Sequence, residues 1–144
     1  MSGKLTIEEL IAAEGKFVST TSGVSMEPLF SDRRDTIIIL PPNGRLKKYD
    51  VPLYRRGEDY VLHRVIKVLP DSYVIRGDNC ENNEYGVTDA DIIGVLYAFY
   101  RKNKYAEVTD FRYRMYSFCI VSSFPIKKFF RRVRAKLRRI FKKR

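Results

Sequence analysis

The sequence predicts a mainly β domain of antiparallel sheets, with a short helix at its N-terminus and a basic amphipathic helix at its C-terminus. Three observations support this prediction: short β-branched and aromatic segments divided by turns, one helix-capping signal, and an apolar stripe at helical spacing. The chain has 144 residues, of which 44% are hydrophobic and 13% aromatic. This composition is typical of a folded domain with a substantial core and excludes a disordered chain.

The N-terminal helix is predicted from Thr6 and Glu9, whose spacing is that of a capping box, and from Gly15, which suits a helix stop. Extended segments follow, each ending at a turn of Gly, Pro, Asn or Asp. Their predicted ranges are 16–21, 36–40, 51–55, 60–69, 73–76 and 92–100. Many short strands with tight turns and few helices favour antiparallel pairing.

The net positive charge is confined to the C-terminal part of the chain. Residues 111–144 contain 13 of the 28 Lys and Arg and none of the 17 Asp and Glu, so they carry +13, whereas residues 1–110 carry −2. We therefore predict a globular domain over residues 1–110 and a basic appendage over residues 111–144. Apolar residues recur at steps of three and four between Pro125 and Arg144, which predicts an amphipathic helix there.

The predicted partner of this helix is an anionic membrane surface, bound through residues 125–144. Aromatic and aliphatic side chains would face the lipid while Lys and Arg face the headgroups. Two alternatives stay open, a nucleic-acid-binding arm and a disordered solubilising tail. No DNA-reading motif precedes the tail, and its apolar residues are spaced as on a helix, so nucleic acid is not the expected partner.

The sequence predicts neither a membrane-spanning helix nor a signal peptide. Its start, MSGKLTIEEL, is acidic and amphipathic, and no window supplies the ~20 apolar residues of a spanning helix. Peripheral attachment is therefore predicted, with the cytoplasmic face as the expected side. Cys80 and Cys119 lie in unlike contexts without metal-binding spacing. We expect free thiols, no metal site and no other cofactor.

Three stretches contain candidate reactive residues. Ser25 lies in SGVSMEPLF, residues 22–30, and a serine hydroxyl is a poor nucleophile without a neighbouring base. The one histidine is His63, in YVLHRVIKV, where strand alternation places it on the same face as Val61 and Val65. Partial burial there would keep the ring neutral and able to accept a proton.

A base also needs an orienting group, and the turn RGDNCENNEYG, residues 76–86, offers carboxylates. Asp78 and Glu84 are the candidates, and Glu81 is a weaker one. Taken separately, each stretch also has a structural interpretation: Ser25 as a turn residue, His63 as a satisfied strand residue, and the acidic segment as a hairpin.

Taken together, the stretches resemble type I signal peptidases. GVSMEPLF resembles the nucleophile box of that family, and YDVPLYRR resembles the strand that follows, with Tyr49 where glycine is usual. VLHRVIKV is similar to the strand of the general base, which is histidine in the endoplasmic-reticulum and archaeal type. RGDNCENNEYGV resembles the acidic box. The matches cover about residues 20 to 97 in family order. LexA-type self-cleaving repressors share the fold but use lysine as the base, and Arg64 stays protonated and cannot replace it.

The resemblance implies a coiled antiparallel β domain over residues 1–110 in which Ser25 is the nucleophile and His63 the base. Glu84 would assist the histidine and Asp78 would hold the turn, although which acid is the third catalytic member stays open. The backbone N–H of Ser25 would hold the oxyanion, because Gly23 stands where many members have a serine. Met26 would line a cleft that takes an extended peptide by strand addition, with small side chains at the cleavage site.

The predicted function is therefore a serine endopeptidase that cleaves a signal or leader peptide within a preprotein. Ordinary members have an N-terminal membrane span, which this sequence does not show. The enzyme would work on the cytoplasmic side, or the tail and an export partner would replace the anchor. The alternatives are an inactive peptide-binding domain of the same fold, against which the intact Ser25 and His63 argue, and a nucleic-acid-binding protein acting through its tail.

Overall fold

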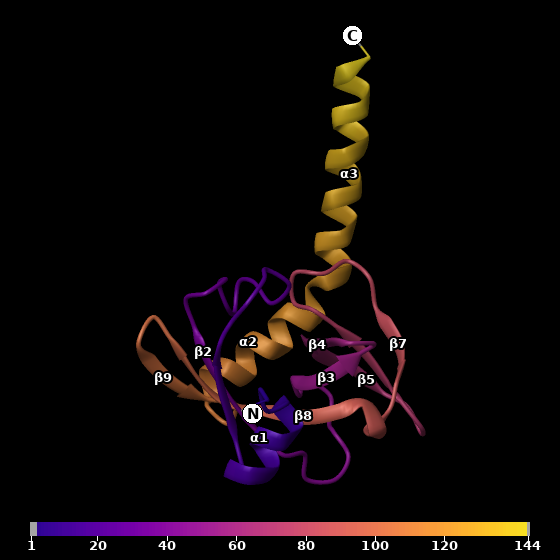
Figure 1. Ribbon diagram of the computed structural model, residues 1–144. Coiled ribbons are helices and arrows are strands. Elements are labelled where there is room, and N and C mark those ends of the chain that lie inside the picture. Colours follow the sequence, from indigo (N-terminus) through magenta and orange to yellow (C-terminus); the bar gives the residue numbers. More distant parts are fainter. Residues whose placement is uncertain (1–2, 144) are drawn as a thin grey trace.

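Two antiparallel sheets form the body of the molecule in the computed structural model, which describes residues 3–143 (Figure 1). The larger sheet has the order β1-β2-β8-β3-β4, with β9 paired to the outer part of β8, and the smaller sheet has the order β5-β6-β7. The strands are β1 (Phe17–Thr20), β2 (Thr36–Leu40), β3 (Pro52–Arg56), β4 (Asp59–Leu62), β5 (Arg64–Val68), β6 (Tyr73–Arg76), β7 (Glu84–Val87), β8 (Ile92–Arg101) and β9 (Lys104–Glu107).

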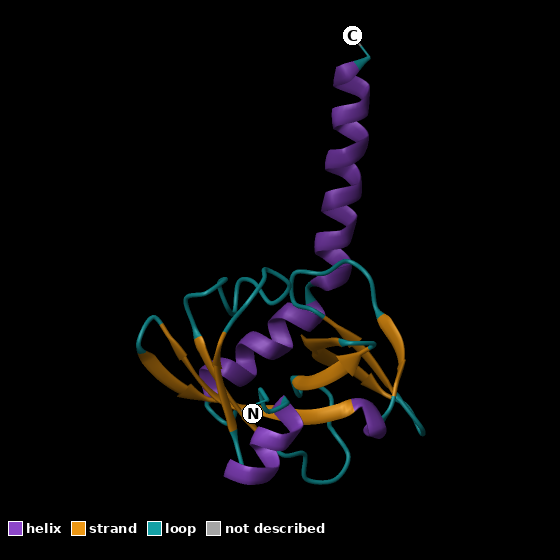
Figure 2. Cartoon of the chain, viewed as in Figure 1, coloured by secondary structure: helices purple, strands orange, loops and turns teal. Residues whose placement is uncertain are grey.

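The predicted fold class is confirmed: the chain is mainly β, and its strands are antiparallel and curled (Figure 2). The predicted N-terminal helix is α1 (Ile7–Glu14), which begins at the expected capping box. The hydroxyl of Thr6 accepts the Glu9 N–H, and the Glu9 carboxylate accepts the Thr6 N–H. Gly15 ends the helix in the left-handed conformation (φ 74°). One short 3-10 helix, η1 (Asp89–Asp91), precedes β8.

The body has two hydrophobic cores, and consecutive residues of β3 and β4 point into different ones. Leu53 packs in the first core with residues of β2, β8 and the Ser25 loop, whereas its neighbour Tyr54 packs in the second. On β4, Val61 belongs to the second core and Leu62 packs against the first. The strands that flank His63 therefore tie the two cores together.

The segment predicted as one strand over residues 60–69 is two strands of different sheets. β4 ends at Leu62 and β5 begins at Arg64, so His63 stands alone between them. Val61 and Val65 nevertheless face the same core, as the alternation predicts. The break turns the chain from the larger sheet into the smaller one and places the histidine at the joint.

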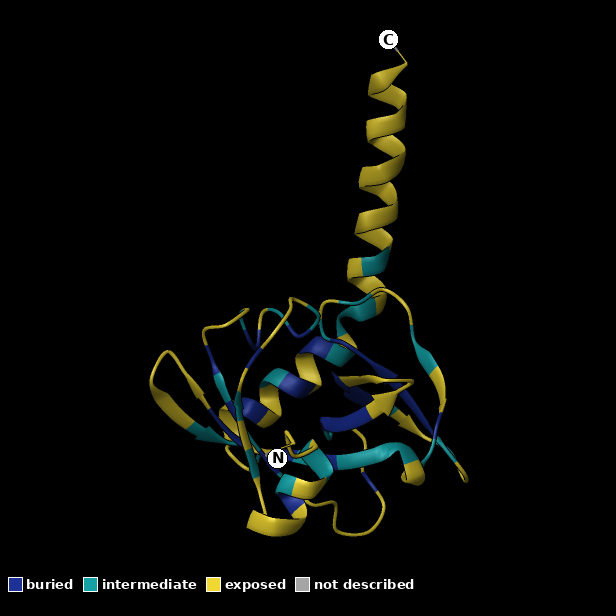
Figure 3. Cartoon of the chain, in the orientation of Figure 1, coloured by how far each residue is buried: buried dark blue, intermediate teal, exposed yellow. Residues whose placement is uncertain are grey.

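The basic C-terminal region consists of two parts with different packing. α2 (Phe111–Ser122) lies against the body and buries Tyr113, Ser117 and Ile120. α3 (Phe124–Lys142) extends away from the body and is exposed along nearly its whole length (Figure 3). The predicted helix over 125–144 is thus present as α3, and Arg144 lies outside the described residues.

Candidate active site

A groove of about 540 Å³ contains both Ser25 and His63, and we call it the Ser25 groove. Its sides are β1 and β4, the strands at the two ends of the larger sheet's main path. Phe17, Ser19 and Thr20 line it from one side and Tyr60, Val61 and Leu62 from the other. The sheet curls so that these two ends face each other across the groove. Sequence segments almost 40 residues apart are thereby brought to one site.

The loop that carries Ser25 is held by the turn at residues 77–80. The Asn79 N–H donates to the Ser25 carbonyl oxygen (2.9 Å), and the Asn79 side-chain amide donates to the Val24 carbonyl (3.1 Å). Within residues 3–143, the backbone N–H of Ser25 donates to no protein acceptor. The Gly23 N–H, in contrast, donates a hydrogen bond to the carboxylate of Asp32 (2.7 Å). The Ser25 N–H is therefore free to donate a further hydrogen bond.

His63 is buried, and one of its ring nitrogens is already occupied. Its Nδ1 lies 3.3 Å from the hydroxyl oxygen of Tyr54, while its Cδ2 faces the backbone of Gly77. Burial lowers the pKa of His63 below its ordinary value of 6.5, although the Glu84 carboxylate opposes this shift. The ring is therefore held in its neutral form at neutral pH.

Glu84 reaches the histidine through Tyr54. The Tyr54 hydroxyl lies 2.5 Å from Glu84 Oε2 and donates its proton to that carboxylate. Burial, followed by this hydrogen bond, raises the pKa of the Tyr54 hydroxyl, so the phenol stays protonated. Because its one proton is given to Glu84, Tyr54 interacts with His63 as an acceptor, and Nδ1 is then the protonated nitrogen. His63 Nε2 is left as the lone-pair nitrogen.

Asp78 makes no hydrogen bond to His63. Its carboxylate instead pairs with Arg64, the residue that follows His63 in the sequence. The two groups form a bidentate ion pair with both contacts at 2.8 Å, and their side chains are 0% and 2% exposed. Burial opposes the charge on Arg64, but the Asp78 carboxylate outweighs it and raises the pKa of the guanidinium. This pair ties β5 to the turn that holds the Ser25 loop, so Asp78 is a positioning residue.

α2 completes the shell around this ion pair. The Tyr116 hydroxyl donates to Asp78 (2.9 Å), and Arg64 Nη1 donates to Ser117 Oγ (2.7 Å) and to the Tyr113 hydroxyl (3.3 Å). Among the described residues, no buried side-chain nitrogen or oxygen lacks a partner. The buried charges thus have hydrogen-bond partners throughout, and α2 provides three of those partners.

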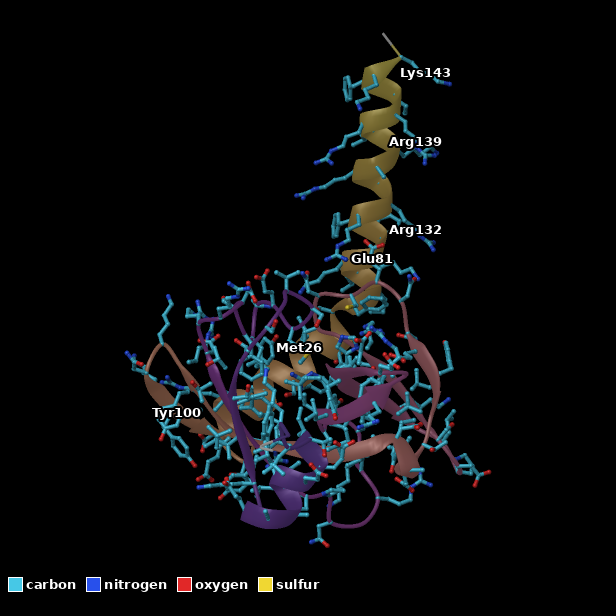
Figure 4. All side chains as sticks on the ribbon, viewed as in Figure 1. Met26, Glu81, Tyr100, Arg132, Arg139 and Lys143 are labelled. Carbon is cyan, nitrogen blue, oxygen red and sulfur yellow. The ribbon has the colours of Figure 1, made fainter. Side chains whose placement is uncertain are left out.

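Met26 lies inside the body (Figure 4) and is one of the residues that line the Ser25 groove. Its side chain is 5% exposed, packs in the first core, and presents its sulfur to the Asp78 N–H (3.4 Å). It therefore fixes the depth of the groove and the position of the turn together. The predicted role in lining a substrate cleft stays a prediction.

Two residues of this site were not identified as contributors from the sequence. Tyr54 lies in YDVPLYRR, whose alternation predicts a buried strand position but does not indicate a hydrogen-bond partner for the hydroxyl. Arg64 was considered only as a substitute base. A charged residue within a valine-rich strand is a signal that Arg64 is buried and paired, because a buried arginine needs a carboxylate partner.

Gly77 is closely packed between the two candidate reactive residues. A Cβ at this position would lie 2.6 Å from the Ser25 carbonyl oxygen, 2.7 Å from the Cys80 sulfur and 3.0 Å from His63 Cδ2. Gly77→Ala should therefore displace Ser25 from His63 and reduce cleavage of a peptide substrate by on the order of a hundredfold, because small misplacements cost that much. Steady-state kinetics measure the effect.

Gly3→Ala is the matched control, since a Cβ there meets nothing within 4 Å. It should leave the rate unchanged. Wild-type kinetics in Gly77→Ala would contradict the packing described for the site.

Residues 3–143 contain no metal-binding cluster and no membrane-spanning helix. No group of three or more His, Cys, Asp or Glu in this range is placed to hold a metal ion. Cys80 and Cys119 are free thiols, as expected. No helix in the same range has both the length and the apolar character needed to cross a bilayer.

No family model, curated protein or solved structure matches this chain.

Proposed function

We propose that this protein is a serine endopeptidase that cleaves a signal or leader peptide, with Ser25 as nucleophile and His63 as general base. The observation that carries the proposal is the juxtaposition in one groove of a serine with a free backbone N–H and a buried histidine whose Nδ1 is occupied by Tyr54. This arrangement leaves Nε2 to accept the serine proton.

Cleavage would proceed through an acyl-enzyme. His63 Nε2 takes the hydroxyl proton of Ser25 as Oγ attacks the carbonyl carbon of the scissile bond, and the Ser25 N–H stabilises the oxyanion. The oxyanion then collapses, the C–N bond breaks, and the amine leaves with the proton from His63. Water, deprotonated by the same histidine, hydrolyses the ester.

The chain from His63 through Tyr54 to Glu84 supports this mechanism. When Nε2 takes a proton the ring becomes a cation, and Tyr54 and Glu84 stabilise that charge on the far side of the ring. The structure contains no hydrogen bond between the Ser25 hydroxyl and His63. Such bonds are often long before substrate binds and shorten in the reactive complex.

An extended peptide fits the groove because strands form both of its sides. Within residues 3–143, β1 pairs only with β2 and β4 only with β3, so each has a free edge to offer to a peptide backbone. The walls are apolar on the whole, and Arg56 together with Ser19 and Thr20 of β1 provides polar contacts. The substrate class is therefore a peptide bound in an extended conformation.

Labelling with a serine-acylating fluorophosphonate probe tests this proposal. The wild-type chain should be labelled with one probe per molecule and Ser25→Ala should not be labelled. Ser22→Ala is the matched control, because Ser22 is an exposed serine that belongs to the same loop and also lines the groove. Equal labelling of wild type and Ser25→Ala would overturn the assignment.

The pH dependence of cleavage should follow the protonation of His63. Only the neutral ring accepts a proton, so kcat/KM should be lost as the pH falls through the pKa of the folded protein. Burial places that pKa below 6.5, hence activity should be on its plateau at pH 7 and fall only under more acidic conditions. A pH–rate profile measures the midpoint. A midpoint above 6.5 would contradict the buried, neutral histidine.

We further propose that α3 attaches the protein to an anionic membrane surface. When α3 is projected down its axis at about 100° per residue, seven of its apolar side chains fall within an arc of about 120°. They are all exposed, and they are Ile126, Phe129, Phe130, Val133, Leu137, Ile140 and Phe141. The nine Lys and Arg of the helix fill the remaining surface, and it contains no acid.

Only the base of α3 contacts the body. Arg131 pairs with Glu81 (3.1 Å), and the guanidinium of Arg76 lies over the Phe124 ring (3.3 Å). Farther along, Arg132, Arg139 and Lys143 project away from the body (Figure 4). An isolated helix with this charge repels itself, and anionic lipid relieves the repulsion while covering the apolar arc.

Vesicle flotation should show the full-length protein on phosphatidylglycerol-containing vesicles at low salt and not on phosphatidylcholine vesicles. Phe130→Ser with Leu137→Ser should abolish this binding by interrupting the apolar arc. The control pair Leu5→Ser and Val68→Ser removes two exposed apolar side chains of the body and should bind as wild type. A full-length protein that stays unbound under these conditions would refute membrane attachment.

A further inference from the structure

A second cavity, of about 500 Å³, lies between α2 and the segment that precedes β3. It shares no lining residue with the Ser25 groove. Its deep part is apolar and includes Val51 and Leu96, which are 1% and 2% exposed. Its outer part is formed by Phe111, Met115 and Phe118 of α2, together with residues of the 47–50 segment.

The apolar residues of α2 in this cavity are not used for packing. Phe111, Met115 and Phe118 recur at steps of four and three, so they lie on one face of the helix. Their side chains are 75%, 45% and 54% exposed, whereas Tyr113, Ser117 and Ile120 face the body. A cavity continuous with such an exposed apolar face is a feature of ligand-binding surfaces.

The rim of the cavity is cationic. Lys47, Lys48 and Arg114 line it, all three are exposed, and none has a carboxylate within salt-bridge distance in the described part of the chain. The one acid of the lining is Asp50, whose carboxylate accepts the Lys47 N–H (2.8 Å).

Part of the backbone around the cavity is already paired, and the Tyr49 N–H donates to the Val65 carbonyl (2.9 Å). The Leu96 N–H donates to the Val51 carbonyl (2.9 Å), and the other wall is the helix α2. An extended peptide would therefore find no strand edge here. An apolar interior with unpaired cations at the mouth suits a ligand that has an acyl chain and an anionic head.

We propose that this cavity binds one anionic phospholipid, with its phosphate at Lys47, Lys48 and Arg114 and an acyl chain along Phe111, Met115 and Phe118. This site is separate from the α3 surface and does not depend on the peptidase function. Tyr113 and Ser117 line the cavity and also contact Arg64, so an occupant is in direct contact with the shell of the buried ion pair. Binding should therefore also raise the melting temperature.

Isothermal titration calorimetry on the full-length chain tests the site, with dihexanoyl phosphatidylglycerol below its micelle concentration as the probe. We expect saturable binding of one molecule per chain. Dihexanoyl phosphatidylcholine, which has the same chains but no net charge, should bind at least about tenfold more weakly. Lys47→Gln with Lys48→Gln should weaken phosphatidylglycerol binding by about tenfold, since both side chains are exposed and their loss leaves the fold intact.

Lys142→Gln with Lys143→Gln is the matched control, because it removes the same charge from the end of α3. This variant should bind the probe as wild type does, and Phe111→Ser with Phe118→Ser should not. The proposal is overturned by equal affinity for the two phospholipids, by equal loss in the α3 control, or by the absence of saturable binding.

Discussion

Ser25→Ala and His63→Ala should each remove peptide cleavage while leaving the domain folded. The expected loss in kcat is on the order of 10⁴ to 10⁶, because nucleophile and base act as one unit. For the same reason the double variant should be little slower than either single variant. Ser25 is half-buried and its hydroxyl carries no structural hydrogen bond among the described residues, so replacing it should scarcely change stability.

The measurement is single-turnover cleavage of a peptide substrate together with thermal unfolding. Ser22→Ala, three residues away, should retain wild-type rates and so exclude a general effect on the loop. Full cleavage by purified Ser25→Ala would place the chemistry elsewhere. If losses in the two single variants simply added in the double variant, Ser25 and His63 would not be acting together.

The second large effect separates the two acids. Asp78→Asn should cost about 3 to 5 kcal/mol of unfolding free energy, because it leaves the fully buried Arg64 guanidinium without its carboxylate. Cleavage should fall with it, since the Ser25 loop rests on the same turn. Glu84→Gln removes a carboxylate whose side chain is 26% exposed, so its cost in stability should be small.

Glu84→Gln should instead lower turnover by up to about a hundredfold, because the amide is a poorer acceptor for Tyr54 and the His63 cation loses its stabilising charge. Urea unfolding and kinetics on the two variants give the comparison. Glu81→Gln serves as control, since it breaks an exposed pair with Arg131 worth less than about 1 kcal/mol. A fully active Glu84→Gln would remove the Tyr54 link from the mechanism.

Local signals account for the parts of the fold that the sequence predicts well. The capping box at Thr6 and Glu9 is complete within four residues, and the apolar run 36–40 is closed by its own turn. β7 and β9 were not predicted. β7 contains Gly86 within an acidic turn, and β9 has the polar sequence KYAE, so neither shows a pattern of its own. Their pairing with β6 and β8 determines them.

The candidate site shows the same limit. Sequence motifs identify Ser25, His63, Glu84 and Asp78, yet the partners of the two acids depend on how separate segments fold together. Glu84 was expected at the histidine, and Tyr54 lies between them. Asp78 is expected to hold the turn, and its carboxylate binds Arg64 of β5 and Tyr116 of α2, which lie far away in the sequence. Such long-range pairing leaves no trace in local spacing.

The place of His63 between β4 and β5 couples its orientation to the relative position of the two cores. The residue before it packs against one core and the residues after it belong to the smaller sheet. A shear or partial opening between the sheets would rotate the imidazole away from Ser25 before either core is exposed to water. If His63 is the base, as proposed, thermal inactivation of cleavage should therefore precede global melting, with sub-global opening between the two sheets as its cause.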